Sequence, residues 1–196
     1  MVIPLLISSI NLSVSFPVRD FIKEAKKTSQ YLQSMDNNGD EIDGKDEVLC
    51  PIDMNFMRDD LIYEILINPI KDNSKVSMRV ILDCCHSGTG IDLPYKYSLI
   101  YRKSELVTNN NENIEANIIM LSGCKDNQTS SEVEINNKSR GLMTWTFNKI
   151  IKQYGKNITC HDLLILIRNM LLSNCFDQIP QLTSSKPLTS VSKFLL

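Results

Sequence analysis

The feature that most constrains the fold is an apolar run at residues 76–83 that leads directly into a cluster of reactive residues. That cluster is Asp-Cys-Cys-His-Ser-Gly, at residues 83–88. The run is rich in Val, Ile and Leu and predicts a buried strand, after which Gly88 and Gly90 allow the backbone to turn sharply. Proteins of the α/β class place their chemistry at the carboxyl ends of such strands. The sequence therefore predicts an α/β fold with a functional site directly after residue 83.

Two neighbouring cysteines follow this strand, and Cys85 is the candidate nucleophile. A cysteine attacks as its thiolate and commonly relies on a histidine base. His86 is adjacent, but successive side chains diverge, so an immediate neighbour is rarely placed as the base. From the residues alone, the alternative stays open that Cys84 and Cys85 are small buried residues at a strand end.

The segment that begins with this cluster, Asp-Cys-Cys-His-Ser-Gly-Thr-Gly-Ile-Asp-Leu-Pro-Tyr at residues 83–95, resembles the active-site signature of the metacaspases. Metacaspases are calcium-dependent cysteine endopeptidases of the caspase-like fold that cut after Arg or Lys. Further segments of that family recur here in the same order, at residues 40–53, 59–60, 122–130 and 180–187. The resemblance covers residues 36–196. It implies an α/β, caspase-like, mostly parallel sheet flanked by helices and lacking the family's first strands.

The resemblance implies that Cys85 is the nucleophile and that Asp83 helps to form an acidic pocket that selects Arg or Lys in protein or peptide substrates. A charge argument agrees, because Asp83 lies two residues before Cys85 on a strand, projects to the same side and can pair with a cation. The residues alone leave an alternative open. In it, Asp83 is a strand-end acid that bonds to loop amides.

The resemblance also implies a calcium site made of Asp46, Asp59, Asp60 and Asp92. Carboxylates from three segments suit a hard divalent ion that takes six to eight oxygen ligands. Alternatives remain open: Asp46 is then a loop residue and Asp59 the N-cap of the next helix. Residues 36–47 can also be laid on an EF-hand loop, but Glu41 stands where that loop needs glycine.

The family's catalytic histidine lies in an upstream Ser-Gly-His-Gly segment, whereas residues 21–34 contain neither histidine nor glycine. The chain has two histidines, His86 and His161, and the second is expected to be exposed in the first turn of a helix that begins near Thr159. Loss of a general base costs about 10²–10⁴-fold in rate. We therefore expect an impaired endopeptidase. The alternative is a non-catalytic calcium- or protein-binding domain, or an inactive gene fragment.

The 196 residues fit one domain. Residues 1–35 match no part of the family and are expected to be a divergent or truncated N-terminus, with a possible helix at residues 18–32. Residues 36–196 form the metacaspase-like domain, in which residues 96–117 are predicted to be a mobile loop between a larger and a smaller part. The resemblance implies that Arg102 and Lys103 in that loop are candidate processing sites, although any exposed basic pair would look the same. Residues 191–196 are predicted to form the last strand.

The charge balance of 21 basic and 23 acidic residues gives no sign of nucleic-acid binding. Six cysteines follow no disulfide framework and no zinc-site spacing, which favours free thiols and a cytoplasmic protein. No run approaches the roughly 18 apolar residues of a membrane span. The resemblance further implies a monomer.

Overall fold

The computed structural model describes residues 28–35, 45–51, 57–83, 90–107, 113–125, 132–135 and 138–194. Its strands are β1 (Thr28–Met35), β2 (Lys45–Pro51), β3 (Met57–Arg58), β4 (Ser77–Leu82), β5 (Tyr95–Ser98), β6 (Lys103–Leu106), β7 (Asn117–Ser122), β8 (Glu132–Ile135), β9 (Lys138–Gly141) and β10 (Gln181–Ser184). Its helices are α2 (Asp59–Ile62), which continues as the π-helical turn η1 (Tyr63–Ile67), α3 (Leu142–Tyr154) and α4 (Cys160–Ser173). None of the described helices is long and apolar enough to cross a membrane.

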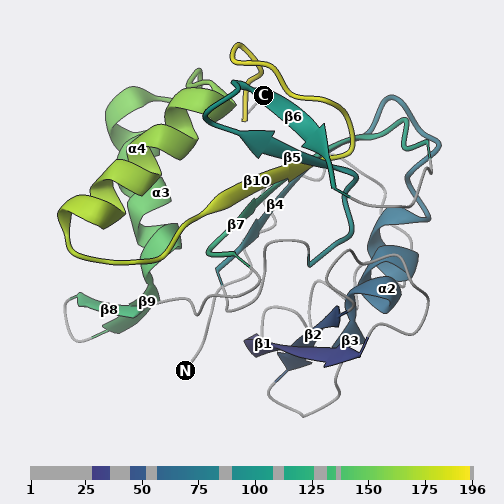
Figure 1. The fold of residues 1–196 in the computed structure, drawn as a ribbon, viewed down its shortest axis with the longest axis horizontal. Coiled ribbons are helices and arrows are strands. Elements are labelled where there is room, and N and C mark those ends of the chain that lie inside the picture. Colours follow the sequence, from purple (N-terminus) through teal and green to yellow (C-terminus); the bar gives the residue numbers. More distant parts are fainter. Residues whose placement is uncertain are drawn as a thin grey trace.

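The main sheet has five described strands in the order β4-β7-β10-β5-β6 (Figure 1). The strand predicted before residue 83 is β4, which pairs in parallel with β7 so that Val80 lies opposite Met120. The other three described pairings are antiparallel. The predicted α/β class is confirmed, but the described part of the sheet is mixed rather than mostly parallel. One reason is that β5 and β6 form a tight hairpin, which can only be antiparallel, and β10 adds two further antiparallel pairings with β7 and β5.

Side chains on the two faces of the sheet build two separate apolar clusters. Met78, Val80 and Leu82 of β4 pack with Ile62 and Leu66 from α2 and η1. Side chains of alternate residues point to opposite faces of a strand, so the other face receives a different set. On that face, strand residues pack against residues of α3 and α4. This second cluster includes Ile81, Leu121, Leu142, Phe147, Leu163 and Leu182. Figure 1 shows α3 and α4 together on one side of the sheet and α2 on the other.

The helix boundaries follow local sequence signals. α3 ends before Gly155, whose φ of 80° is in the left-handed region that favours glycine. α4 begins at Thr159, whose hydroxyl oxygen accepts a 3.0 Å hydrogen bond from the Asp162 amide, as the predicted capping box requires. The helix predicted to begin near Thr159 is confirmed.

Three predicted segments are wrong in part. Residues 28–32, the end of the helix predicted at residues 18–32, lie instead in β1, which pairs antiparallel with β2. The predicted mobile loop at 96–117 instead holds most of the β5–β6 hairpin, while residues 108–112 lie outside the described residues. The last strand is β10, in the middle of the sheet. At residues 191–194 the structure has one isolated bridge, between Lys193 and Thr159.

Pairing between strands explains why the predictions for residues 28–32 and for the hairpin at residues 95–106 are wrong. β1 is mostly polar, and its apolar residues Tyr31, Leu32 and Met35 follow no alternating pattern. Its strand state therefore depends on the antiparallel partner β2. The β5–β6 hairpin is likewise completed by β10, which binds β5 along its other edge. The intrinsic strand propensity of a segment does not reveal which other strands it will pair with.

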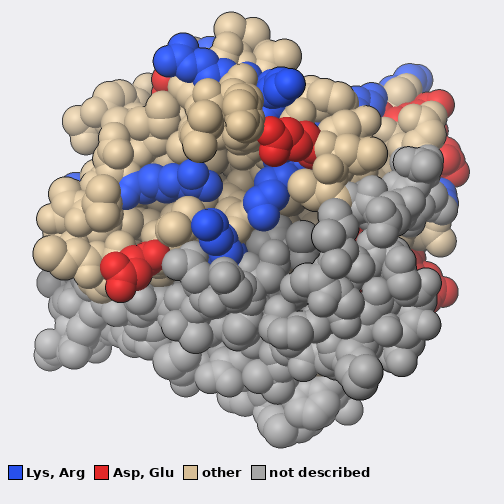
Figure 2. All heavy atoms as spheres, in the orientation of Figure 1, with Lys and Arg blue, Asp and Glu red and all other residues tan. Residues whose placement is uncertain are grey.

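Figure 2 shows charged side chains spread over the described part of one face of the molecule. On that part, Lys and Arg groups are separated by neutral and acidic ones. Residues 138–196 contain eight Lys and Arg and two Asp and Glu, so the remaining 137 residues contain 13 basic and 21 acidic ones. The C-terminal part of the chain is therefore basic and the rest is acidic.

Candidate active site

Asp83 follows the last residue of β4 and is almost fully buried, with 1% of its surface exposed. Its Oδ2 atom accepts a 2.8 Å hydrogen bond from the backbone N–H of Thr144, in the first turn of α3. The open alternative, that Asp83 bonds to backbone amides, is thus confirmed for one amide, which belongs to a helix rather than a loop. Cys84, the candidate nucleophile Cys85, and His86 lie outside the described residues.

The carboxyl end of β4 is fixed to the neighbouring strand. The Gly123 N–H donates a 2.7 Å hydrogen bond to the Leu82 carbonyl, which extends the β4–β7 pairing to its last residue. The buried Gln178 side chain donates a 2.7 Å hydrogen bond to the Gly123 carbonyl. Asp83 therefore projects from a well-anchored strand end, which is the setting that a site at a sheet edge requires.

Gly141 allows the close approach between Asp83 and α3. A Cβ atom at residue 141 would lie 2.5 Å from Asp83 Cγ and closer still to Oδ2. Gly141 has φ −59°, which any residue adopts, so the requirement for glycine comes from the contact and not from the backbone. Sequence reasoning missed this contact because Asp83 and Thr144 are 61 residues apart and share no local pattern.

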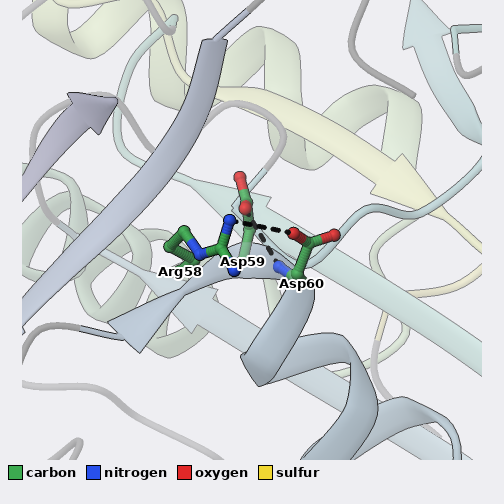
Figure 3. Close-up of polar contacts among 3 residues, drawn as sticks. All are labelled: Arg58, Asp59 and Asp60. Atoms are coloured by element: carbon green, nitrogen blue, oxygen red, sulfur yellow. Dashed lines mark hydrogen bonds and ion pairs between the residues drawn. The ribbon is translucent and has the colours of Figure 1, made fainter. Parts of the chain in front are cut away.

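Asp59 and Asp60 lie side by side at the start of α2, next to Arg58 (Figure 3). Asp59 is buried, and its Oδ1 accepts a 2.9 Å hydrogen bond from the Asp60 N–H. The Asp60 carboxylate forms a 3.8 Å ion pair with the half-exposed Arg58. The N-cap of α2 is Arg58, so the alternative that Asp59 is the N-cap is wrong by one residue.

The other two predicted calcium ligands come from different segments. Asp92 is half-buried and has φ 48°, a left-handed conformation uncommon for a residue other than glycine. Asp46 pairs through its backbone with Ser34, and its side chain lies outside the described residues. Carboxylates are chemically suited to calcium, but the described side chains contain no group of three or more that could hold a metal ion. The four-aspartate site therefore stays a prediction, and most of the EF-hand alternative lies outside the described residues.

His161 is buried rather than exposed, so that prediction is wrong. It lies in the first turn of α4, with 8% of its surface exposed, and its Nδ1 is 3.1 Å from the Tyr97 hydroxyl of β5. The rings also meet edge to face. β5 is three strands away from β4, roughly 14 Å at about 4.8 Å per strand. The contact with Tyr97 therefore keeps His161 away from the carboxyl end of β4.

The described cysteines Cys124, Cys160 and Cys175 are free thiols, as the sequence predicts for these three. Burial raises the pKa of the Cys160 thiol to about 12, against smaller opposing effects of Arg79 and a backbone hydrogen bond. A thiol with so high a pKa is almost entirely protonated at neutral pH and is a poor nucleophile. Cys160 therefore does not compete with Cys85 for a catalytic role.

The sequence profile of the caspase domain family matches residues 18–191 of this chain. The match begins upstream of residue 36, where the motifs alone place the start of the similarity. It includes the strand end at Asp83, the Cys84–Cys85 pair and α3.

Curated metacaspases are similar to most of this chain. Metacaspase-1 of Schizosaccharomyces pombe is 30% identical, and the similarity covers 80% of this chain and 47% of that protein. Metacaspase-1 of Meyerozyma guilliermondii is also 30% identical, with coverages of 82% and 50%. Metacaspase-1A of Aspergillus terreus is 30% identical, with coverages of 80% and 49%. The chain spans about half the length of these relatives.

A crystal structure of a protein from Geobacter sulfurreducens has a similar fold, with a TM-score of 0.55. The two sequences are 22% identical over 86% of this chain and 69% of the other. This likeness concerns the fold alone, and it supports the observed arrangement of sheet and helices.

Proposed function

This chain belongs to the caspase domain family, a family of cysteine-type peptidases, and from that premise we propose that it is a metacaspase-like endopeptidase domain with Cys85 as its nucleophile. The observation that carries the proposal is the anchored, buried Asp83 at the carboxyl end of β4, two residues before Cys85 in the sequence. Proteins of the α/β class place their functional residues at strand ends of this kind.

The proposed reaction has two steps. The Cys85 thiolate attacks the carbonyl carbon of the scissile peptide bond and forms a thioester, while the amine leaves with a proton. Water then attacks the thioester, releases the carboxylic acid and returns the proton to the thiol. Each step needs a group that takes up and delivers a proton, and in this chain no histidine stands at the family's position.

We propose that this lack impairs the peptidase. Among the described residues, His161 is the one histidine, and Tyr97 holds it three strands from β4. Without a general base the thiolate fraction near neutral pH is small, and the rate falls by about 10²–10⁴-fold.

We further propose that the domain cuts after Arg or Lys and depends on calcium. The Asp83 carboxylate lies two residues before the nucleophile in the sequence, and a carboxylate can pair with a cationic side chain. When bound, calcium would be held by Asp46, Asp59, Asp60 and Asp92 and would link the segments that carry them. Free thiols at Cys124, Cys160 and Cys175 suit a reducing, cytoplasmic location.

A non-catalytic binding domain is the second candidate function, and the missing histidine favours it. In that case the Asp83 carboxylate serves as a cap for α3, and the chain binds proteins or peptides without cleaving them.

Peptide hydrolysis distinguishes the two functions. The purified chain is incubated with fluorogenic peptides that end in Arg, Lys or Leu, with and without calcium. We expect slow, calcium-dependent cleavage after Arg and Lys that Cys85→Ala abolishes and the matched control Cys84→Ala retains. Residual hydrolysis that is the same in Cys85→Ala and in the unmodified chain would refute the enzymatic function.

Calcium binding is tested apart from activity by isothermal titration calorimetry. We expect Asp59→Asn and Asp60→Asn to weaken binding at least tenfold, because each removes one carboxylate ligand. Asp72→Asn is the matched control, since Asp72 is an exposed acid that does not belong to the proposed ligand set. Equal affinities in all three variants would exclude the proposed ligand set.

A further inference from the structure

We propose that the turn of the β5–β6 hairpin, together with the C-terminal segment beside it, is a docking surface for an anionic lipid bilayer. This tip surface combines exposed apolar and exposed basic side chains: Ile100, Tyr101, Arg102, Lys103, Val191 and Lys193. The proposal does not depend on the peptidase activity of the domain.

The turn exposes apolar side chains where turns usually carry small or polar ones. Protein turns favour Gly, Pro, Asn, Asp and Ser, but residues 99–102 are Leu-Ile-Tyr-Arg. Leu99 packs against the second apolar cluster, whereas Ile100 is 87% and Tyr101 is 65% exposed. Arg102 has φ 51°, a conformation that costs free energy for a residue other than glycine. Turn stability does not explain this sequence, which points to a binding role.

Contacts on both strands hold the turn in place. The hydroxyl of Tyr97, on β5, lies 3.1 Å from Nδ1 of the buried His161. On β6, the Ser104 N–H donates a 3.3 Å hydrogen bond to the Leu188 carbonyl, and the Ser104 hydroxyl accepts a 2.9 Å bond from the Leu188 N–H. The exposed residues therefore belong to an anchored hairpin and lose little backbone freedom when they bind.

The C-terminal segment extends the same surface. Isolated bridges join Thr189 to Lys103, next to the turn, and Lys193 to Thr159, at the start of α4. Val191 lies between these two bridges and is 73% exposed. The β5–β6 turn and the yellow C-terminal segment lie together at the top of Figure 1, and Figure 2 shows Lys and Arg groups beside neutral ones at that end.

The charges of the tip surface suit anionic headgroups. Arg102 and Lys103 are exposed, and neither forms an ion pair with a residue that the structure describes. Two exposed acids lie nearby, and each already faces a polar partner. Glu105 is opposite Lys96 in the hairpin, and the Asp162 carboxylate accepts a 2.7 Å hydrogen bond from the Thr159 hydroxyl.

A bilayer fits this combination of side chains. In segments that lie at a membrane surface, aliphatic groups enter the boundary of the acyl chains, Tyr lies at the headgroup level and Lys or Arg bind anionic lipids. Ile100, Tyr101 and Arg102 supply these three functions within one turn. Such peripheral contact needs no membrane-spanning helix, and none of the described helices is one.

The test is co-sedimentation of the intact chain with vesicles of phosphatidylcholine, alone or with about 30% phosphatidylserine. EDTA is present, so calcium cannot bridge protein and lipid. We expect the chain to bind the mixed vesicles at least about tenfold more tightly than phosphatidylcholine alone, and less tightly as salt is added.

The apolar part is tested by a chain that carries both Ile100→Ser and Tyr101→Ser. We expect its affinity for mixed vesicles to fall at least about tenfold, because two apolar side chains no longer enter the lipid. Leu172→Ser is the matched control, since Leu172 is 72% exposed near the end of α4 and lies outside the tip surface. Its affinity should change less than about twofold.

The basic part is tested by Arg102→Gln, which should weaken binding about fivefold, the effect of one basic residue at an anionic surface. Lys75→Gln removes the same charge from an exposed residue just before β4, at the opposite edge of the described sheet. That control should change the affinity less than about twofold.

Three outcomes overturn the proposal. The first is the absence of binding to mixed vesicles, and binding to poly-glutamate in that case would assign the surface to an acidic protein. The second is an equal loss of affinity in the Ile100 and Tyr101 variant and in Leu172→Ser. The third is an equal loss in Arg102→Gln and Lys75→Gln, because binding would then follow net charge rather than the tip surface.

Discussion

At the scale of single residues, buried polar groups on the α3–α4 face show how tertiary contacts set chemistry. Arg79, on β4, is 3% exposed, and its guanidinium bonds to the carbonyl oxygen of Phe194. It also donates to the carbonyls of Met78 and Asn117, at 2.8 and 3.0 Å. Burial lowers the pKa of Arg79, yet an arginine remains charged at physiological pH. A buried cation thus ties β4, β7 and the C-terminal segment together.

Replacement of Arg79 by methionine should destabilise the protein by about 2–4 kcal/mol, because three carbonyl groups lose a charged donor. The free energy of unfolding is measured by urea denaturation. Arg168→Met is the matched control: Arg168 donates one 2.8 Å hydrogen bond to the Pro180 carbonyl, so we expect a loss of about 1 kcal/mol. Equal losses in the two variants would contradict the central role of Arg79.

Stability should depend on pH through Cys160. The pKa of its thiol is about 12 in the folded protein and 9.0 by reference, so the unfolded chain ionises first as pH rises. The contribution of the buried thiol is complete below about pH 9 and is lost as pH rises towards 12. Well above pH 9 the free energy of unfolding should fall by up to about 1.4 kcal/mol per pH unit.

Urea denaturation between pH 8 and 10.5, for the unmodified chain and Cys160→Ala, isolates this effect. The difference in stability between the two proteins should shrink as pH rises, because only one of them carries the thiol. A constant difference over the whole range would show that Cys160 does not contribute.

At the scale of elements, the β5–β6 hairpin limits the access of a protease to the candidate processing sites. Arg102 lies in the turn with φ 51°, and Lys103 is the first residue of β6. The outer edge of β6 is held by the C-terminal segment, through the Ser104 hydroxyl, which accepts a 2.9 Å hydrogen bond from the Leu188 N–H. Cleavage at either residue therefore requires local opening of a paired hairpin.

Ser104→Ala should accelerate cleavage by trypsin after Arg102 or Lys103 by about fivefold, because loss of one hydrogen bond lowers the cost of opening by about 1 kcal/mol. Cut sites are identified by mass spectrometry. Ser173→Ala is the control, since the Ser173 hydroxyl bonds to its own helix at an exposed position. An equal rate in the unmodified chain and in Ser104→Ala would show that cleavage proceeds without opening at this edge.

At the scale of the whole molecule, the sheet joins two apolar clusters that do not share side chains. Met120 and Leu121 are neighbours on β7, both fully buried, and they belong to opposite clusters. Because one strand carries both, damage to either cluster should destabilise the entire domain.

Met120→Ala should cost about 2–5 kcal/mol, the range for a large side chain removed from a packed core. Trp145 on α3 packs against the other cluster, and its fluorescence should nevertheless report the same lowered midpoint as far-UV circular dichroism. Lys152→Ala, an exposed change on α3, should alter stability by less than about 0.5 kcal/mol. A Trp145 transition that stays at the unmodified midpoint would show that the two halves unfold independently.

The sequence by itself determined the elements whose signals are local: the β4 strand with its reactive end, the Gly155 stop of α3, the Thr159 cap of α4 and the family. These depend on residues within a few positions of each other. Only the tertiary structure decided the strand state of residues 28–35, the hairpin at residues 95–106, the burial of His161 and the contact of Asp83 with Gly141 and Thr144. The burial of His161 and the contacts of Asp83 depend on partners more than 50 residues away in the sequence. The two strand regions depend on pairing with other segments, which the propensity of single residues does not reveal.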